Sequence, residues 1–428
     1  GARFIAADIV PQVDFVVAEC HYPIIRQRGY AVECAALFNL LVEIPLEAAK
    51  VGLLGLGTVG GGTATVLLRN ADEIQRRLGR SIEITHAAGL GIADQTLLDA
   101  GKVKLTEDAF EVVNDPDVEI VVELIGGYTL AKDLVMKAIE NGKLGVTANK
   151  AVIATHGPEI MQAALARGVT VAYEAAVAGG IPIIKAVREG LAANRIKWIA
   201  GIINGTGNFI LTEMRDKGRD FDDVLKEAQA LGYAEADPTF DIEGIDAAHK
   251  LTILASLAFG IELQFDKCYT EGISKITTED VNYAGELGYR IKHLGITRKT
   301  DHGIELRVHP TLIPEKRLIA NVDGVMNAVL VQGDAVGPTL YYGAGAGAEP
   351  TASAVVADII DTVRSIDVDA GHKVPLLGFK PDAMSDIAIM PIEDVETACY
   401  LRMTALDTPG VLAEVSEVFA QHKISLEA

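Results

Sequence analysis

Charged side chains directly precede a strongly apolar run in residues 232–255. If a helix begins just after Gly244, Asp246 and Lys250 lie four residues apart and project from one face of it. The leucines that follow require burial, so the Lys250 ammonium is drawn toward the interior. There it must be paired, or its pKa must fall to a value useful for proton transfer. Taken alone, this spacing favours an ordinary surface ion pair.

Three further segments carry polar groups that suit a binding site. Lys150 follows a short strand at 145–146, at the edge where parallel sheets bind ligands; a solvated loop lysine is the alternative. Residues 204–209 are rich in side-chain amides, with the hydroxyl of Thr206. They suit a small polar substrate and equally fit a polar turn. Glu174 opens a Gly- and Ala-rich turn, where it would cap a helix or ligate a small cation with backbone carbonyls.

A glycine-rich turn indicates a dinucleotide-binding site. An apolar strand at 51–54 runs into Gly55-x-Gly57-x-x-Gly60, and a helix is expected over 63–78. The first glycine permits a tight turn, the second lets backbone approach a pyrophosphate, and the third allows the helix to pack on the strand. A glycine-rich structural turn is the alternative. After the second strand (82–88), Asp94 is the one charged residue that could bind the ribose of the cofactor. The choice between NAD and NADP therefore stays open.

The elements that must position these residues are of the α/β class. Near-continuous apolar runs at 118–125 and 169–173 are typical of buried parallel strands, and a helix is expected over 131–141. Helices at 183–193 and 221–231 flank a strand at 196–203. Strands at 306–310, 325–332 and 340–342 predict a second, mixed sheet. A second glycine-rich helix entrance, 343–351, leads into a helix over 352–364 that could close back on the cofactor.

Composition limits the partners. The 428 residues carry 38 Lys and Arg against 59 Asp and Glu, a net charge of −21 that disfavours nucleic acid or an anionic membrane surface. Apolar runs are too short to span a bilayer. The four cysteines form no CxxC pair, which indicates reduced thiols in a cytosolic, cytoplasmic protein. Residues 1–49 carry no motif, and we assign them no role.

The chain from 51 to about 364 resembles homoserine dehydrogenases. The matching motifs are VGLLGLGTVGGG, VVELIGG, TANKA, YEAAVAGGIPII, GIINGTGNFIL, LGYAEADPTFDIEGIDAAHK, RVHPTLIP and YYGAGAGAEPTASAVV. The GIINGTGNF loop and the GYAEADP stretch are specific to this family, whereas the nucleotide fingerprint is generic. The resemblance implies NAD(P)-dependent interconversion of L-homoserine and L-aspartate 4-semialdehyde, in threonine and methionine biosynthesis. Its fold would be a Rossmann-type domain plus an α+β mixed-sheet domain.

Site residues follow from this resemblance. Lys250 matches the proton-transfer lysine, Glu235 and Asp246 match carboxylates that hold the substrate amine, and Lys150 matches the lysine of the cofactor and substrate crevice. Thr206 is expected on the substrate. The cofactor contacts implied are Gly55, Leu56, Gly57, Thr58, Val59, Gly60, Gly126, Lys150, Gly232 and Gly347. The monovalent cation site (Na⁺ or K⁺) implied is Glu174 with the carbonyls of Val177, Gly179 and Ile181.

The resemblance also predicts domains and assembly. We expect an unassigned segment at 1–49, a dinucleotide-binding domain at 50–178 completed by 343–375, a substrate-binding and dimerisation domain at 179–342, and a linker at 376–398. Residues 399–428, with a strand at 400–403 and a helix to 421, are similar to the first part of an ACT domain. Half of such a domain cannot bury its sheet face, so we expect it to be disordered or paired. A homodimer or tetramer is implied, with threonine as feedback inhibitor of an intact form.

Two other classes of function are weighed. A semialdehyde dehydrogenase acting through a thioester needs a nucleophilic cysteine with a nearby base, and Cys268 has no adjacent histidine in the sequence. A non-catalytic amino-acid sensor would use the ACT-like segment as its binding module, and the incomplete segment disfavours it.

Overall fold

The computed structural model describes residues 47–89, 103–369 and 372–426. The chain divides into two compact units, residues 1–48 with 79–81 and residues 49–78 with 82–428. Everything below concerns the second unit. The segment 1–46 and Asp94 lie outside the described residues. No helix in the described part of the chain is long and apolar enough to cross a membrane.

The first sheet is wholly parallel, with strand order β3-β2-β1-β4-β5-β6. Its strands are β1 (Ala49–Leu54), β2 (Ile82–Ala88), β3 (Lys104–Thr106), β4 (Ile120–Glu123), β5 (Leu144–Thr147) and β6 (Val171–Ala172). The direction in which strands are added reverses at β1, because β2 and β3 lie on one side of β1 and β4, β5 and β6 lie on the other. Such a switch point opens a crevice at the carboxyl ends of the strands, which is where a dinucleotide binds in Rossmann-type folds.

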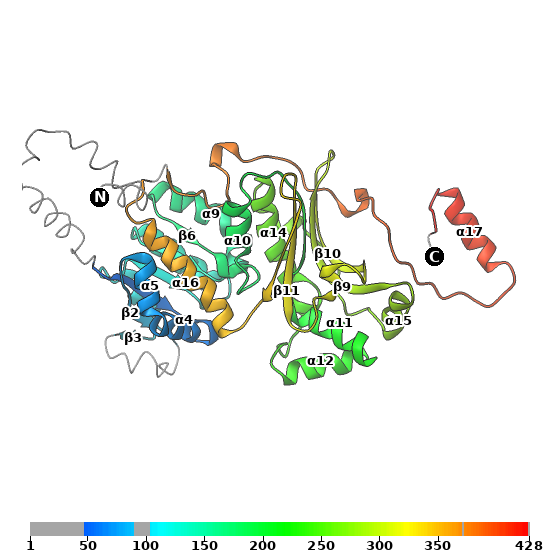
Figure 1. Ribbon diagram of the computed structural model, residues 1–428, viewed down its shortest axis with the longest axis horizontal. Helices are drawn as coiled ribbons and strands as arrows, with labels where there is room; N and C mark the ends of the chain where they lie inside the picture. Colours follow the sequence, from blue (N-terminus) through cyan, green and yellow to red (C-terminus); the bar gives the residue numbers. More distant parts are fainter. Residues whose placement is uncertain (1–46, 90–102, 370–371, 427–428) are drawn as a thin grey trace, which may run out of the picture. The chain divides into compact units, whose positions relative to one another are not determined.

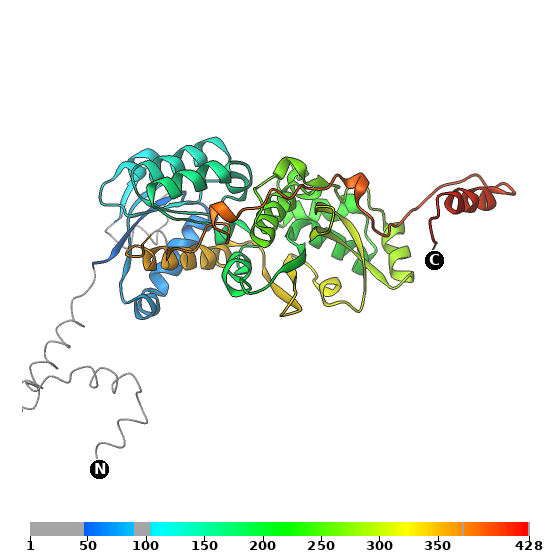
Figure 2. The ribbon, with the colours of Figure 1, turned by 90° about the horizontal axis from the view of Figure 1, so that it is seen from above.

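Helices cover both faces of this sheet (Figure 2). On one face lie α4 (Thr58–Arg69), α5 (Ala71–Leu78) and α16 (Ala348–Arg364), which share one apolar cluster with the strands. On the other face lie α7 (Ala109–Asn114), α8 (Thr129–Glu140) and α9 (Lys150–Arg167). Because α16 comes after the second sheet in the sequence, the chain returns to the first sheet and packs against α4 (Figure 1).

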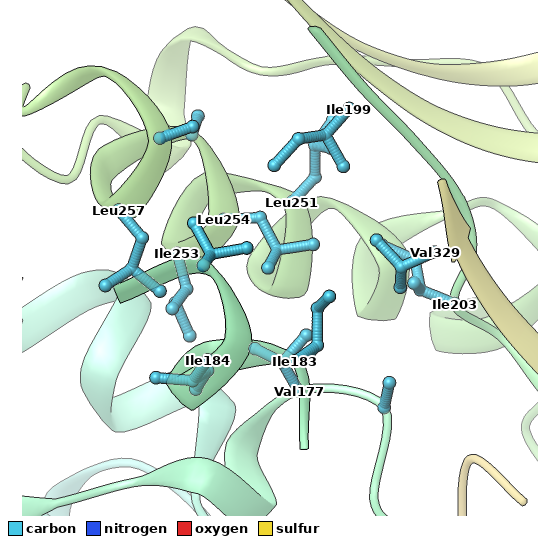
Figure 3. Packing of buried hydrophobic residues seen from close by; sticks show 14 of the residues in the cluster. Val177, Ile183, Ile184, Ile199, Ile203, Leu251, Ile253, Leu254, Leu257 and Val329 are labelled. Atoms are coloured by element: carbon cyan, nitrogen blue, oxygen red, sulfur yellow. The ribbon is translucent and has the colours of Figure 1, made fainter. Parts of the chain in front are cut away.

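The second sheet is mixed, with order β12-β11-β7-β9-β10-β8. Its strands are β7 (Ile196–Ile202), β8 (Tyr269–Thr270), β9 (Tyr289–Lys299), β10 (Ile304–Pro314), β11 (Met326–Gly333) and β12 (Pro338–Ala344). Pairing is antiparallel except between β8 and β10. Helix α14 (Ile245–Phe259) packs its leucines against this sheet. Figure 3 shows Leu251 and Leu254 beside Ile199 and Val329 in the largest core cluster.

Shorter helices surround this core. They are α10 (Ile183–Lys185), with a π-helical turn at Ala186–Gly190, α11 (Gly205–Lys217), α12 (Phe221–Ala230), α13 (Thr239–Ile242) and α15 (Thr278–Glu286). Helices α11, α12 and α15 share a separate apolar cluster that includes Leu211, Val224 and Val281.

Several sequence predictions of local structure were wrong. The helix after the fingerprint begins at Thr58, not residue 63, and breaks at Asn70, so Gly60 and Gly62 lie inside α4. The polar loop expected at 204–209 is mostly the first turn of α11, because the Asn204 side chain accepts a hydrogen bond from Gly207 N and caps the helix. Helix α16 begins at Ala348, four residues early.

The strand expected at 400–403 is also wrong. These residues are non-regular, and Tyr400 and Arg402 bond to the Asp280 carboxylate instead (3.0 and 2.6 Å). An isolated edge strand needs a partner strand, and none of the described residues supplies one. The following helix, α17 (Val411–Gln421), is present, with Leu412 80% exposed.

Candidate active site

The N-terminus of α14 holds the predicted pair. Gly244, at φ 83°, makes the left-handed turn from α13 into α14 that other residues rarely adopt. One turn later, Lys250 Nζ donates to Asp246 Oδ2 (2.7 Å) and to the Ile203 carbonyl (2.7 Å). The two side chains are only 12% and 6% exposed. The pair is therefore buried, and the surface-pair reading is wrong.

A second ammonium reaches the same carboxylate from the first domain. Asn149 caps α9 by accepting a hydrogen bond from Val152 N, which places Lys150 at the first position of that helix. Lys150 Nζ lies 3.1 Å from Asp246 Oδ1 and 5.6 Å from the centre of the Phe240 ring. The Asp246 carboxylate thus joins lysines from the ends of two elements that are far apart in sequence.

These contacts set the protonation of the site. Burial disfavours the Asp246 carboxylate, but the charges of Lys250 and Lys150 together hold its pKa well below the usual range. Burial lowers the pKa of Lys250, and the attraction of Asp246 opposes that shift only in part. The result is an ionised carboxylate beside an ammonium that releases its proton more readily than a lysine in water.

Two residues that sequence reasoning did not assign to the site complete it. Asn204 Nδ2 donates to both Asp246 Oδ2 and Asp241 Oδ1 (2.8 Å each). Burial, reinforced by the charge of Asp246, raises the pKa of Asp241. Asp241 stands in the charged stretch before α14, and Asn204 in the amide-rich motif. Both segments stood out in the sequence, but the hydrogen bond between Asn204 and Asp241 could not be predicted from it.

Other predicted substrate contacts are less closely joined. Thr206 is buried and donates its hydroxyl to the Tyr233 carbonyl (2.6 Å). Glu235 is exposed, and its carboxylate has no hydrogen bond or ion pair to any described residue, so the structure does not bring it to the Asp246 cluster. Its assignment stays a prediction.

The glycine-rich turn has the geometry that a pyrophosphate requires. Gly55 has φ 95°, and a Cβ on Gly60 would lie 1.9 Å from the Gly55 carbonyl oxygen. A Cβ on Gly57 would meet no atom of the described residues within 4 Å, so this side of the turn is open to a ligand. Gly57 caps α4 without a side-chain hydrogen bond, and no acid lies in the first turn. Helix N–H groups here are available for phosphate. Leu56, Thr58 and Val59 lie in the same turn.

The remaining predicted cofactor glycines border exposed turns. Gly126 (φ 81°) and Gly232 (φ 76°) have open space where a side chain would stand. Gly126 follows β4, and its N–H donates to the buried carboxylate of Glu123 (3.1 Å). Gly347, at φ 124°, caps α16 opposite α4. The residues present therefore fit a dinucleotide along the carboxyl edge of the first sheet.

The Glu174 turn is buried and rich in oxygen atoms. Glu174 accepts hydrogen bonds from Ile184 N and Lys185 N (2.8 Å each), and burial raises its pKa. The carbonyls of Val177 and Gly179 accept no hydrogen bond from any described residue, whereas that of Ile181 accepts one from Ile183 N (2.7 Å). Buried carbonyls need a partner. Oxygen donors of this kind fit a hard cation.

The thioester alternative does not fit. Burial raises the pKa of the Cys268 thiol to about 12, and among the described residues its Sγ hydrogen-bonds only to the Tyr269 carbonyl and to no basic side chain. A nucleophilic cysteine requires a lowered pKa or an adjacent base.

Comparisons with known proteins agree with this geometry. Residues 55–174 match the family model "Homoserine dehydrogenase, NAD binding domain", and residues 182–360 match the model "Homoserine dehydrogenase". With the parallel sheet and the buried lysine–carboxylate pair, these matches define an NAD(P)-dependent oxidoreductase acting on a CH–OH group.

Individual relatives narrow this class of enzyme further. The chain is 66% identical to homoserine dehydrogenase of Pseudomonas aeruginosa, over 90% of this chain and 88% of the relative, and 61% identical to that of Neisseria gonorrhoeae, with the same coverage. The crystal structure of a homoserine dehydrogenase from Thiobacillus denitrificans aligns with TM-score 0.85 and 66% identity, covering 90% of this chain and 88% of that one. The chain belongs to the homoserine dehydrogenase family. The predicted activity, interconversion of L-homoserine and L-aspartate 4-semialdehyde, is thereby confirmed.

Proposed function

We propose that Lys250 is the proton-transfer residue of this reaction. The observation that carries the proposal is the bonding of its ammonium. Two N–H groups bind Asp246 and the Ile203 carbonyl, and the third has no partner among the described residues. An oriented donor with one free N–H in a buried site suits the oxygen of a reacting carbonyl or alcohol.

The chain's residues then have distinct roles. When bound, NAD(P) accepts or supplies the hydride. In oxidation, neutral Lys250 takes the hydroxyl proton of homoserine; in reduction, its ammonium returns a proton to the aldehyde oxygen. Asp246 orients Lys250 and, with Glu235, holds the substrate amine. Lys150 fixes the other carboxylate oxygen of Asp246 and faces the crevice, and Thr206 borders the substrate.

Replacing Lys250 by Ala tests this assignment. We expect kcat to fall about 10²- to 10⁴-fold, the usual contribution of a general acid–base group, with cofactor affinity within twofold of wild type. Lys267→Ala is the matched control, because Lys267 is exposed and bonds only to Gln264. Near-normal turnover of Lys250→Ala would remove the assignment.

We also propose that Glu174, Val177, Gly179 and Ile181 hold a sodium or potassium ion. The buried carboxylate and the two carbonyls that accept no hydrogen bond from the described residues support this. Replacing choline by potassium or sodium in the buffer should raise the melting temperature of wild type, and Glu174→Gln should abolish the rise. Equal melting temperatures in all three salts would contradict the proposal.

Assembly and location are proposals too. The second sheet face opposite α14 carries the partly buried Trp198, Leu330 and Leu340, with Tyr342 58% exposed, which supports a homodimer or tetramer through this face. Sedimentation of Leu330→Arg should show a monomer.

We propose a cytoplasmic location, and threonine as a feedback inhibitor acting through the ACT-like segment 399–428. An archaeal homoserine dehydrogenase solved with NADPH, 26% identical with TM-score 0.63, supports NADP as one cofactor, while NAD stays open.

A further inference from the structure

A buried histidine precedes the proposed catalytic lysine and has no polar partner in the part of the chain that the structure describes. His249 precedes Lys250 on α14 and is 1% exposed. Neither of its ring nitrogens has a hydrogen-bond partner among the described residues. Its ring stacks on Phe265 (centroids 4.1 Å apart) and lies 5.5 Å from Phe240 and 6.3 Å from Tyr128. The protein therefore encloses an imidazole in an aromatic box and leaves both of its polar atoms unused.

Packing does not explain an imidazole at this position. Each buried polar atom without a partner is destabilising, and a phenylalanine would fill an aromatic box with no such atoms. Residues kept against stability are typical of functional sites. The nitrogens of His249 thus point to a ligand that arrives from outside the chain, and the ring of Tyr128, which is 44% exposed, must move aside to admit it.

The charge of the ring limits what that ligand is. Burial, followed by repulsion from Lys150, lowers the pKa of His249 to about 4. The ring is neutral near pH 7 and carries one N–H donor and one nitrogen acceptor. The ammonium and carboxylate of an amino-acid substrate are better matched by the charged side chains of Lys150 and Asp246. A neutral imidazole among aromatic rings matches a planar, uncharged group that both donates and accepts.

The position of the box agrees with this chemistry. Tyr128 follows the exposed Gly126-Gly127 turn at the carboxyl end of β4, and Lys150 begins α9 after β5. Both lie at the edge of the sheet where a dinucleotide would extend away from its pyrophosphate turn. Phe240 links the box to Lys150, since its ring lies 5.5 Å from that of His249 and 5.6 Å from Lys150 Nζ.

We propose that a ring nitrogen of His249 forms a hydrogen bond with the carboxamide of bound nicotinamide. The proposal rests on the NAD(P) site described above and assigns the residue that holds its reacting end. His249 is then a cofactor-binding residue, and the aromatic box supplies the apolar walls of that site.

The test compares ligands with and without the nicotinamide. Wild type and His249→Phe are titrated with NADH and NADPH, followed by nicotinamide fluorescence, and with ADP-ribose and its 2′-phosphate, followed by calorimetry. His249→Phe should bind the reduced cofactors about threefold to tenfold more weakly, the effect of one lost hydrogen bond. Its affinity for the ADP-ribose ligands should be unchanged, and its melting temperature unchanged or higher.

Two variants keep the result interpretable. His249→Gln retains a donor and an acceptor, so it should lose less affinity for the reduced cofactors than His249→Phe, and it replaces that variant if the latter does not fold. His86→Phe is the control, because His86 is equally buried but bonds to Asp115 (2.8 Å), before β4. It should lower the melting temperature and leave the ratio of the two affinities unchanged.

The outcomes distinguish the assignment of His249 from the proposed cofactor site. Equal affinity of wild type and His249→Phe for the reduced cofactors overturns the assignment, and so does an equal weakening of both classes of ligand. Failure of wild type to bind the ADP-ribose ligands at all would instead overturn the proposed cofactor site.

Discussion

Replacing Asp246 by Asn would show how far its charge sets the pKa of Lys250. Asp246 Oδ2 lies 2.7 Å from Lys250 Nζ in a buried site, and its charge opposes the lowering of the Lys250 pKa by burial. An opposite charge at this range shifts a pKa by about 1 to 3 units. The pKa of Lys250 in Asp246→Asn should therefore fall by a further 1 to 3 units or so, equivalent to about 1.4 to 4 kcal/mol.

The assay is the pH dependence of kcat for homoserine oxidation. Oxidation needs neutral Lys250, so the rate rises as pH passes through its pKa, and the midpoint of this rise should move to lower pH in the variant. In the reverse reaction the ammonium is needed, so activity should be lost at lower pH than in wild type. Asp237→Asn is the control, since Asp237 is exposed and bonds only to Thr239. An unchanged or higher midpoint in Asp246→Asn would refute the electrostatic reasoning.

Three other predictions concern the first sheet and its surroundings. Gly60→Ala should lower the free energy of unfolding by about 1 to 3 kcal/mol, measured by thermal melting, because its Cβ would lie 1.9 Å from Gly55 O. Gly57→Ala should leave the melting temperature unchanged, since nothing lies within 4 Å of that Cβ, but weaken NAD(P)H binding at least about tenfold in fluorescence titration, because backbone approach is blocked. Asp358→Asn should be more stable than wild type at pH 8, with the difference shrinking as pH falls. Burial and the nearby Glu174 raise the pKa of Asp358 well above its usual value, so the folded state is penalised wherever that carboxyl must ionise.

Much of the fold could be predicted because its signals are local. Strand β2 occupies the predicted residues, and β4, β7 and β11 lie within one or two residues of theirs, since continuous or alternating apolar runs report burial directly. The Asp246–Lys250 pair was visible because helical spacing places both on one face. The strand predicted at 400–403 was wrong, because a strand exists only when another strand pairs with it.

Helix starts were predicted less well for a related reason. Gly60 and Gly62 look like loop residues, yet both are helical. A Cβ at Gly60 would strike the backbone of Gly55, and one at Gly62 would strike that of Ala348. Glycine there serves close packing and not a flexible turn. Asn204 looked like a substrate-facing amide, whereas it caps α11 and binds two carboxylates. The contacts of Gly62 with Ala348 and of Asn204 with the two carboxylates lie far away in the chain, so local sequence does not report them.

The amino-acid sequence by itself determined the α/β class, the phosphate turn and the identity of the lysine and carboxylate at the start of α14, because these depend on residue types at short spacing. Only the tertiary structure decided that Lys150 and Lys250 share one buried carboxylate and that Asn204 links it to Asp241. It also decided that His249 is buried with no polar partner among the described residues. Burial and charge at a site are set by residues that approach from separate elements, and their effect on a pKa depends on distances that no sequence interval specifies.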